Sequence, residues 1–363
     1  MYPSLTVLEP AALAESVAAA SARLDEAAAD IRAVDHASLP TLLALLALGC
    51  ARPVRDLLRP TARPSSRPDR VGDHVSAAGR PLAPGDAPAL AALLGRYVAW
   101  TGDTAVARAL WHVQPLVHTA LADVHTAPYG QELVARRITL VAACTALERM
   151  APDVGDAQAA GAFRRAAREL SRGLPDILSP DHRILAAALG VEFPTVVDAG
   201  QAPAPSGDDV VMTTLHFATS VLGLEPDAPR HRLRLRPMLR ELRVRGIPFA
   251  DGTVSLDVER GGPGEWHLRL EQESGAIPVT AVMEPFLPAA PQSALPLSAR
   301  PPDSRRQESG AGGTLPAVTV SVDDTPAALN PRPVPGGVLL PVQLVLDAPR
   351  RLTIQMYEGR SPE

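Results

Sequence analysis

The stretch DDVVMTTLHFATSVLGLEPDAPRHRLRLRPMLRELRVRGIPFADGTVSLDVE, residues 208–259, contains the point at which this chain changes from one kind of secondary structure to another. Up to Gly223 its apolar residues are spaced as in a helix. From Arg232 onward apolar and charged residues alternate, which is the pattern of half-buried antiparallel strands. The glycine and prolines between these parts end helices and form turns. We therefore expect two domains, a helical domain over residues 1–224 and a β domain over residues 229–363.

The chain before Gly223 is expected to contain only helices and loops. Apolar residues recur at helical spacing over residues 10–34, 40–50, 86–100, 104–121, 131–151 and 155–173. The last two helices are joined by the short turn Pro152–Gly155, and helices with such tight connections pack as antiparallel hairpins. Residues 60–86 and 174–207 lack this spacing and are expected to be irregular. The helical domain is thus predicted to be a layer of α/α hairpins.

The chain after Arg232 predicts an antiparallel β-sandwich. Residues 254–258 alternate between apolar and polar side chains, and later segments repeat this period. Turns are expected at Ala250–Gly252 and Gly261–Gly264. About eight short strands separated by such gaps are typical of a sandwich. Pro, Ser, Gly and Arg dominate residues 288–314, which are expected to form a linker or a disordered loop.

Composition and charge exclude several classes of protein. The 363 residues are enough for two domains with cores of their own. All 35 basic residues are arginine, and the net charge of −5 gives no polycationic surface for nucleic acid. The longest apolar run, Leu42–Leu48, is far shorter than the roughly 20 residues that cross a membrane, and the N-terminus lacks the pattern of a signal peptide. We expect a soluble, cytoplasmic protein without a nucleic-acid or membrane partner.

No metal and no cofactor are expected. Cys50 and Cys144 lie far apart, each in an apolar helical pattern that is typical of buried core cysteines. His112, His118 and His125 do not share a helix face at metal-ligand spacing. No glycine-rich loop of the phosphate-binding kind follows a strand and opens a helix.

Three segments carry a resemblance to a known family. They are LLALLALGCARPVRDLLR (42–59), LLGRYVAWTGDTAVARALW (93–111) and VLGLEPDAPRHRLRLRP (221–237). They resemble the helical hairpins, and the junction to the terminal β domain, of bacterial glycogen-debranching, amylo-α-1,6-glucosidase-type proteins of the six-hairpin glycosidase superfamily. The resemblance implies an (α/α)₆ toroid, α-glucan substrates and inverting hydrolysis by paired carboxylates.

The chain departs from this family in ways that predict a shortened and degenerate member. The helices that we predict are too few for a closed toroid, so a partial toroid is expected. No counterpart of the family's general-acid motif is present. In the segment 130–147, which is similar to a family segment that faces the sugar, Glu132 matches an acid of that segment. Val134 and Arg137, however, stand where the family has a polar and an aromatic residue.

The catalytic candidates are Asp86 and Glu132. Inverting hydrolysis needs two carboxyl groups roughly 6.5–9.5 Å apart, one protonated and one that activates water. Both residues also lie at expected helix starts, where an acidic side chain caps free N–H groups and interacts with the helix dipole. Asp208 and Asp209 are also expected to cap a helix start, and Glu192 lies in an expected loop. Capping and catalysis both remain open for these acids.

The candidates for substrate binding are Trp100, Trp111, His74 and Asp208. Sugars stack on aromatic faces, and two tryptophans eleven residues apart on helices would lie on nearly the same face. Packing in the core is the alternative for both tryptophans. His74 lies in the expected 60–86 loop, where it would line the mouth of a cleft or be solvated.

Three functions follow from these observations. The first is a debranching-type glycoside hydrolase. The second is a weakened or non-catalytic relative that binds an α-glucan or another oligosaccharide. The third is an interaction module whose open toroid edge packs against a partner protein or a second copy, since exposed apolar faces mark association sites.

Overall fold

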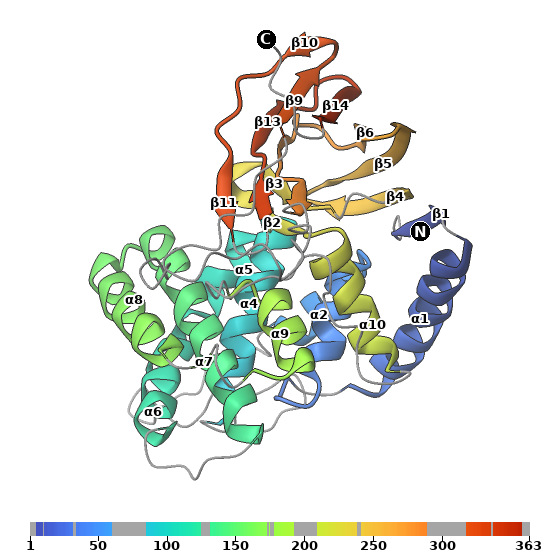
Figure 1. Cartoon of the computed structure of the whole chain (residues 1–363). Helices are drawn as coiled ribbons and strands as arrows, with labels where there is room; N and C mark the ends of the chain where they lie inside the picture. Colours follow the sequence, from blue (N-terminus) through green and yellow to red (C-terminus); the bar gives the residue numbers. More distant parts are fainter. Residues whose placement is uncertain are drawn as a thin grey trace, which may run out of the picture.

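Helices precede strands in the computed structural model of this protein, as the change near Gly223 predicts (Figure 1). The structure describes residues 5–9, 11–31, 34–59, 85–124, 131–172, 174, 178–191, 209–237, 241–288, 317–334 and 337–357. The multidomain fold, with a helical part followed by a β part, is confirmed.

Within the described residues, five inner helices stand side by side in a ring. They are α2 (Leu39–Ala47), α4 (Ala87–Thr101), α7 (Gln131–Met150), α9 (Pro180–Ala188) and α10 (Val210–His216). Each packs against the next, and α10 packs against α2, which closes the ring. Helix α2 has buried apolar residues all round, as expected of a helix enclosed on every side.

Two neighbouring inner helices, α4 and α7, point the same way. Asp86 at the start of α4 lies near Arg136 early in α7, and Gly95 further along α4 meets Ala146 further along α7. These two helices are therefore parallel. The carbonyl of Trp100, near the end of α4, accepts a hydrogen bond from the backbone N–H of Ala250 in the β part, at 2.8 Å. The C-terminal end of the ring thus faces the strands, and the N-terminal end faces away (Figure 1).

Outer helices cover the ring. They are α1 (Ala11–Asp30), α3 (Ala51–Leu58), α5 (Thr104–Ala109), α6 (Gln114–Val124) and α8 (Ala157–Ser171). α1 contacts α10 and α2, α3 contacts α2 and α4, and α6 contacts α4 and α7, while α8 packs on α7. In the part of the chain that the structure describes, no outer helix stands between α9 and α10. This is the partial α/α toroid that the sequence predicts.

Three local predictions differ from the structure. Only helices and loops were expected before Gly223, but residues 6–9 form strand β1 (Thr6–Glu9), which pairs with β4. The helix expected over 104–121 is broken at Leu110 and restarts at Gln114, which places Pro115 in a first turn, where its missing N–H is tolerated. Helix α9 lies in a segment expected to be irregular.

The β part is a sandwich of mainly antiparallel sheets. Its strands are β2 (Glu225–Asp227), β3 (Arg232–Leu235), β4 (Leu242–Phe249), β5 (Gly252–Gly262), β6 (Glu265–Ser274), β7 (Thr280–Met283), β8 (Phe286–Pro288), β9 (Ala317–Val322), β10 (Thr325–Pro326), β11 (Arg332–Val334), β12 (Gly337–Leu339), β13 (Val342–Val345) and β14 (Arg350–Tyr357). The described strands form sheets in the orders β1-β4-β5-β6-β14-β9-β10, β13-β7-β3-β2 and β11-β12-β8, with β3 and β7 parallel. The turns expected at 250–252 and 261–264 join β4 to β5 and β5 to β6.

Two further expectations concern the loop after β8 and the possibility of membrane-spanning helices. The loop predicted over 288–314 lies, apart from Pro288, outside the described residues. Among the described residues, no helix has the length and apolar character needed to cross a membrane.

Candidate functional site

Polar side chains gather where three inner helices begin. Asp35 and His36 lie in the turn before α2, Asp86 precedes α4, and Glu132 and Arg136 lie in the first two turns of α7. Because these helices are parallel, their starts meet at the end of the ring away from the strands. We call these five residues the ring-end cluster. Both predicted catalytic acids belong to this cluster: Arg136 is hydrogen-bonded to Glu132, and its charge acts on Asp86.

Local hydrogen bonds hold the α2 side of the cluster. The Ser38 N–H donates to Asp35 Oδ1 at 2.7 Å, and the Asp35 N–H donates to Ser38 Oγ at 3.0 Å, a reciprocal capping arrangement. His36 Nε2 lies 3.1 Å from the carbonyl oxygen of Gly85. A carbonyl only accepts, so this nitrogen carries the proton and donates. The contact ties the start of α2 to the start of α4.

The surroundings move the pKa values of Asp86 and Asp35 in opposite directions. Burial and the nearby Asp35 carboxylate raise the pKa of Asp86, while His36 and Arg136 act against this rise. Burial also acts to raise the pKa of Asp35, but hydrogen bonds from Ser38 outweigh it and lower that pKa. Burial lowers the pKa of His36, and the Arg136 charge adds to this. Neighbouring carboxyls with separated pKa values are a common basis for acid–base pairs.

Glu132 has a different environment. Its Oε1 accepts a hydrogen bond from Arg136 Nη2 at 2.6 Å, and its side chain is 79% exposed. The pair spans one helical turn, the spacing of ordinary ion pairs along a helix surface. Glu132 is thus an exposed carboxylate already bound to a guanidinium.

The other predicted site residues do not join the cluster. Trp100 is buried and lies at the opposite end of α4, fourteen residues from Asp86, which is about 21 Å along a helix. Trp111 is half-buried against the core, on a separate short turn after α4 ends at Thr101, so the two tryptophans do not share one helix. The acids and the tryptophans therefore cannot line one site.

The remaining candidate residues either cap a helix or lie outside the described residues. Asp209 Oδ1 accepts hydrogen bonds from the N–H groups of Val211 at 2.9 Å and Met212 at 3.3 Å, so it caps α10. His74, Asp208 and Glu192 lie outside the described residues. In the described part of the chain, no three His, Cys, Asp or Glu side chains are grouped so as to hold a metal ion.

Sequence reasoning did not find Asp35, His36 or Arg136. The Asp35–Ser38 spacing before an apolar run was a readable capping signal. The approach of His36 to Gly85 and of Arg136 to Asp86 depends on helix packing, which no local pattern encodes.

We expect Asp86→Asn and Asp35→Asn to change stability with opposite pH dependence. The Asp86 pKa is raised on folding, so the wild type gains stability as pH falls through the folded pKa toward the unfolded value of about 3.9. The Asp86→Asn variant lacks this gain, so its free energy of unfolding should fall relative to that of the wild type as the pH is lowered. The Asp35 pKa is lowered, so the wild type loses that contribution as pH falls, and the deficit of Asp35→Asn should shrink. Urea unfolding at several pH values between 7 and 3 measures both slopes; slopes of the same sign would contradict the assignment.

Comparison with known proteins identifies the fold. No protein-family model matches the sequence, and a comparison with curated proteins gives no match. Among solved structures, an α-L-rhamnosidase from Dictyoglumus thermophilum aligns with 98% of this chain and 50% of its own, with a TM-score of 0.60 and 10% sequence identity. The chain has a six-hairpin glycosidase-like fold. It spans half the length of that rhamnosidase, and this likeness establishes the fold alone.

Two further alignments of this glycosidase-like fold are weaker. One is to a GH78 family rhamnosidase of Bacillus sp. GL1, with a TM-score of 0.43, 15% identity, and coverage of 66% of this chain and 37% of that one. The other is to a GH127 β-L-arabinofuranosidase from Geobacillus stearothermophilus T6, with a TM-score of 0.26, 9% identity, and coverage of 75% and 41%. The likeness in fold rests on the α-L-rhamnosidase alignment alone, and the narrower resemblance to glycogen-debranching proteins stays a prediction.

Proposed function

We propose that this chain binds an oligosaccharide at the ring-end cluster and hydrolyses it weakly or not at all. The glycosidase-like fold supports a carbohydrate as the ligand class. The resemblance of the sequence to debranching proteins supports an α-glucan, and the name of the Dictyoglumus enzyme supports an α-L-rhamnoside. These are the two ligand classes to test.

The position of Arg136 carries the proposal. Its guanidinium donates to Glu132 at 2.6 Å, so it occupies an oxygen that a general base would use to activate water. The same charge acts against the rise of the Asp86 pKa, although burial and Asp35 still keep that pKa above its ordinary value. Arg136 thus opposes chiefly the general-base step of inverting hydrolysis, through its contact with Glu132.

Binding places different demands on the same groups. The Glu132 and Arg136 side chains are 79% and 53% exposed, and together they offer acceptors and donors for sugar hydroxyl groups. His36 and Asp86 lie beside them at the partly buried edge of the cluster. With the tryptophans elsewhere, binding would depend on hydrogen bonds rather than on stacking.

We expect calorimetry to detect binding of maltoheptaose or of an α-L-rhamnosyl oligosaccharide, with little or no release of reducing sugar from either. Glu132→Gln and Arg136→Gln should each weaken binding by about tenfold, because each loses charge-assisted hydrogen bonds. Glu169→Gln, an exposed change on outer helix α8, is the matched control and should bind as the wild type does.

Other outcomes select the alternative functions. Rapid sugar release that is abolished by Asp86→Asn or Glu132→Gln would show a hydrolase and refute the non-hydrolytic reading. A concentration-dependent oligomer that binds neither sugar would refute carbohydrate binding. It would favour the interaction module.

A further inference from the structure

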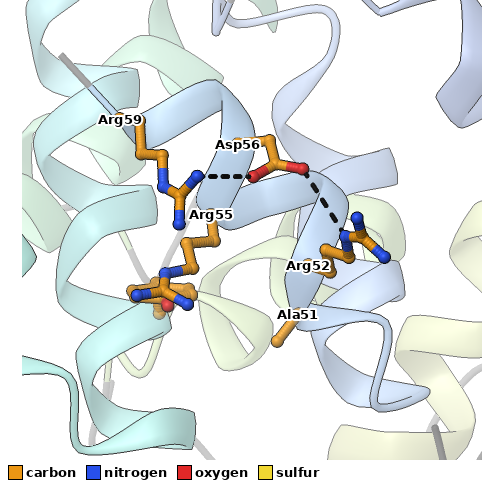
Figure 2. A pocket seen from close by; sticks show the side chains of 6 residues that line it. Ala51, Arg52, Arg55, Asp56 and Arg59 are labelled. Atoms are coloured by element: carbon orange, nitrogen blue, oxygen red, sulfur yellow. Dashed lines mark ion pairs between the residues drawn. The ribbon is translucent and has the colours of Figure 1, made fainter.

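An arginine-rich groove lies on the outer side of the helical domain, away from the ring-end cluster. It has a volume of about 240 Å³, and its lining residues are Ala51, Arg52, Arg55, Asp56, Arg59 and Tyr97 (Figure 2). All but Tyr97 come from α3 and the residue that follows it. Tyr97 is eleven residues after Asp86 on α4, about 16 Å along the helix. The groove and the cluster are therefore separate places.

The guanidinium groups of the groove have unused donors. Arg52 and Arg59 lie 3.9 and 3.7 Å from the Asp56 carboxylate, and Arg55 lies 3.7 Å from Asp103. These separations exceed hydrogen-bond length. Among the described residues, none accepts a hydrogen bond from these three side chains. Elsewhere in the chain, paired arginines such as Arg245 donate at 2.9 Å.

The charge of the groove favours an anion. Its three arginines face two carboxylates, those of Asp56 and Asp103, which leaves one net positive charge. Tyr97 donates its hydroxyl hydrogen to Asp103 Oδ2 at 3.2 Å, so this carboxylate is shared between a phenol and Arg55. The arginine side chains are 48–71% exposed and open to a ligand from solvent.

We propose that this groove binds the phosphate group of a phosphorylated monosaccharide. Arg55 lies in α3 and Arg59 is the residue that follows it, four positions later, so their side chains are neighbours at the end of this helix, and both lie on the same side of it in Figure 2. One guanidinium fork satisfies a carboxylate, which has two oxygens, whereas a phosphate has three terminal oxygens and can bridge two forks. Two adjacent forks therefore fit a phosphate ester better than a uronic acid.

The volume of the groove limits the size of the group that is attached to the phosphate. Pockets that enclose drug-sized molecules are about 300–1,000 Å³. A groove of about 240 Å³ is somewhat smaller, so it suits one sugar unit with its phosphate and not a polysaccharide. This site is independent of oligosaccharide binding at the ring-end cluster, and it would let a sugar phosphate act on the protein away from that cluster.

The test is calorimetric titration of the full chain with glucose 6-phosphate, glucose, galacturonate and inorganic phosphate. We expect glucose 6-phosphate to bind and to lose about tenfold or more in affinity with Arg55→Gln and with Arg59→Gln, since each removes charge-assisted hydrogen bonds. Arg168→Gln, an exposed change of equal charge on α8, should leave the affinity within about twofold. Thermal melts of each variant check that the fold is kept, and these exposed sites should tolerate the change.

Several results would overturn the proposal. They are no binding of glucose 6-phosphate at millimolar concentration, equal or tighter binding of inorganic phosphate or galacturonate, or an Arg168→Gln variant that is weakened as much as the groove variants. Oligosaccharide binding is titrated in the same protein samples, so a failure of this site is distinguishable from a failure of the ring-end cluster.

Discussion

Replacement of Glu284 by alanine is expected to lower the free energy of unfolding by about 3–5 kcal/mol, the effect typical of breaking a buried ion pair from one side. The Glu284 side chain is only 7% exposed. Its carboxylate oxygens lie 2.7 Å from Arg236 Nε, 3.7 Å from Arg234 Nε and 3.6 Å from Arg332 Nη2. Without the carboxylate, Glu225, which also pairs with Arg234 and Arg236, would be left to balance both of these guanidinium groups, and the positive charges would repel one another.

The position of this ion-pair network adds to the expected effect. Strands β3 and β7 are parallel, and the residues that follow them, Arg236 and Glu284, are thereby brought together. The Arg236 N–H also donates to the carbonyl oxygens of Leu222 and Gly223, at 3.1 and 3.2 Å, where the last inner helix passes into the strands. The network thus fastens the end of the helical ring to the β part, and its loss should loosen both.

Urea unfolding monitored by circular dichroism measures the loss. Glu284→Gln keeps the shape and one acceptor, so it should be less destabilising than Glu284→Ala, and it provides a folded comparison should the alanine variant fail to fold. Glu259→Gln is the control, since its partner Arg243 lies 3.2 Å away in an exposed pair, which is worth about 0–1 kcal/mol. Equal small losses for Glu284→Ala and Glu259→Gln would show that the buried network contributes little.

The sequence predicted those elements whose signals are local. The change from helix to strand falls between Val221 and Glu225, within the segment where glycine and proline interrupt both periods. The hairpin turns at 250–252 and 261–264 were likewise visible in the chain itself. Helix α9 was missed although Ser179 caps it by accepting from the His182 N–H at 3.2 Å, because the surrounding prolines suggested an irregular segment.

Non-local features could not be read in the same way. Strand β1 has only four residues and exists because it pairs with β4, more than two hundred residues later in the chain. In the ring-end cluster, the resemblance supplied Glu132 and the expected helix start supplied Asp86, whereas Arg136 became visible only through helix packing. The guanidinium that is hydrogen-bonded to Glu132 was therefore absent from the sequence-based prediction.

The burial of Arg96 in the core could not be predicted from the sequence either. The spacing of apolar residues does not indicate that this arginine is buried, yet it is only 7% exposed, and no described residue accepts a hydrogen bond from its Nε. Burial, with the nearby charge of Arg149, lowers its pKa to about 10. Gly190, just after α9, leaves the space for it, since a Cβ there would lie 2.8 Å from Arg96 Nη1. The end of α9 offers the negative pole of a helix dipole to this charge.

The close contact of α4 with α7 leads to the second large prediction, that Gly95→Ala destabilises the protein by about 1–3 kcal/mol or more. A Cβ at Gly95 would lie 2.3 Å from the Ala146 Cβ and 3.2 Å from its Cα. Both helices would have to move apart, which would disturb the ring where two of its longest inner helices touch. Helix propensity alone predicts the opposite sign, since alanine is favoured over glycine in a helix by about 1 kcal/mol.

Gly161→Ala separates these two effects. Gly161 lies in outer helix α8, where a new Cβ would meet only the mobile end of Arg165, at 3.7 Å. There the propensity term acts alone, so this substitution should stabilise the protein by about 0.5–1 kcal/mol. Opposite signs for two glycine-to-alanine changes in helices would show that α4 and α7 need the glycine for their approach.

A double variant tests the contact itself. Ala146→Gly alone should destabilise by about 1 kcal/mol through helix propensity, but in the Gly95→Ala background it removes the 2.3 Å clash and leaves the 3.2 Å approach to the backbone. The two substitutions should therefore be less destabilising together than the sum of each alone, with a coupling free energy of about 1 kcal/mol or more. Simple additivity in urea unfolding would mean that these residues do not touch, and the parallel packing of α4 on α7, which brings Asp86 and Glu132 to one end of the ring, would lose its main support.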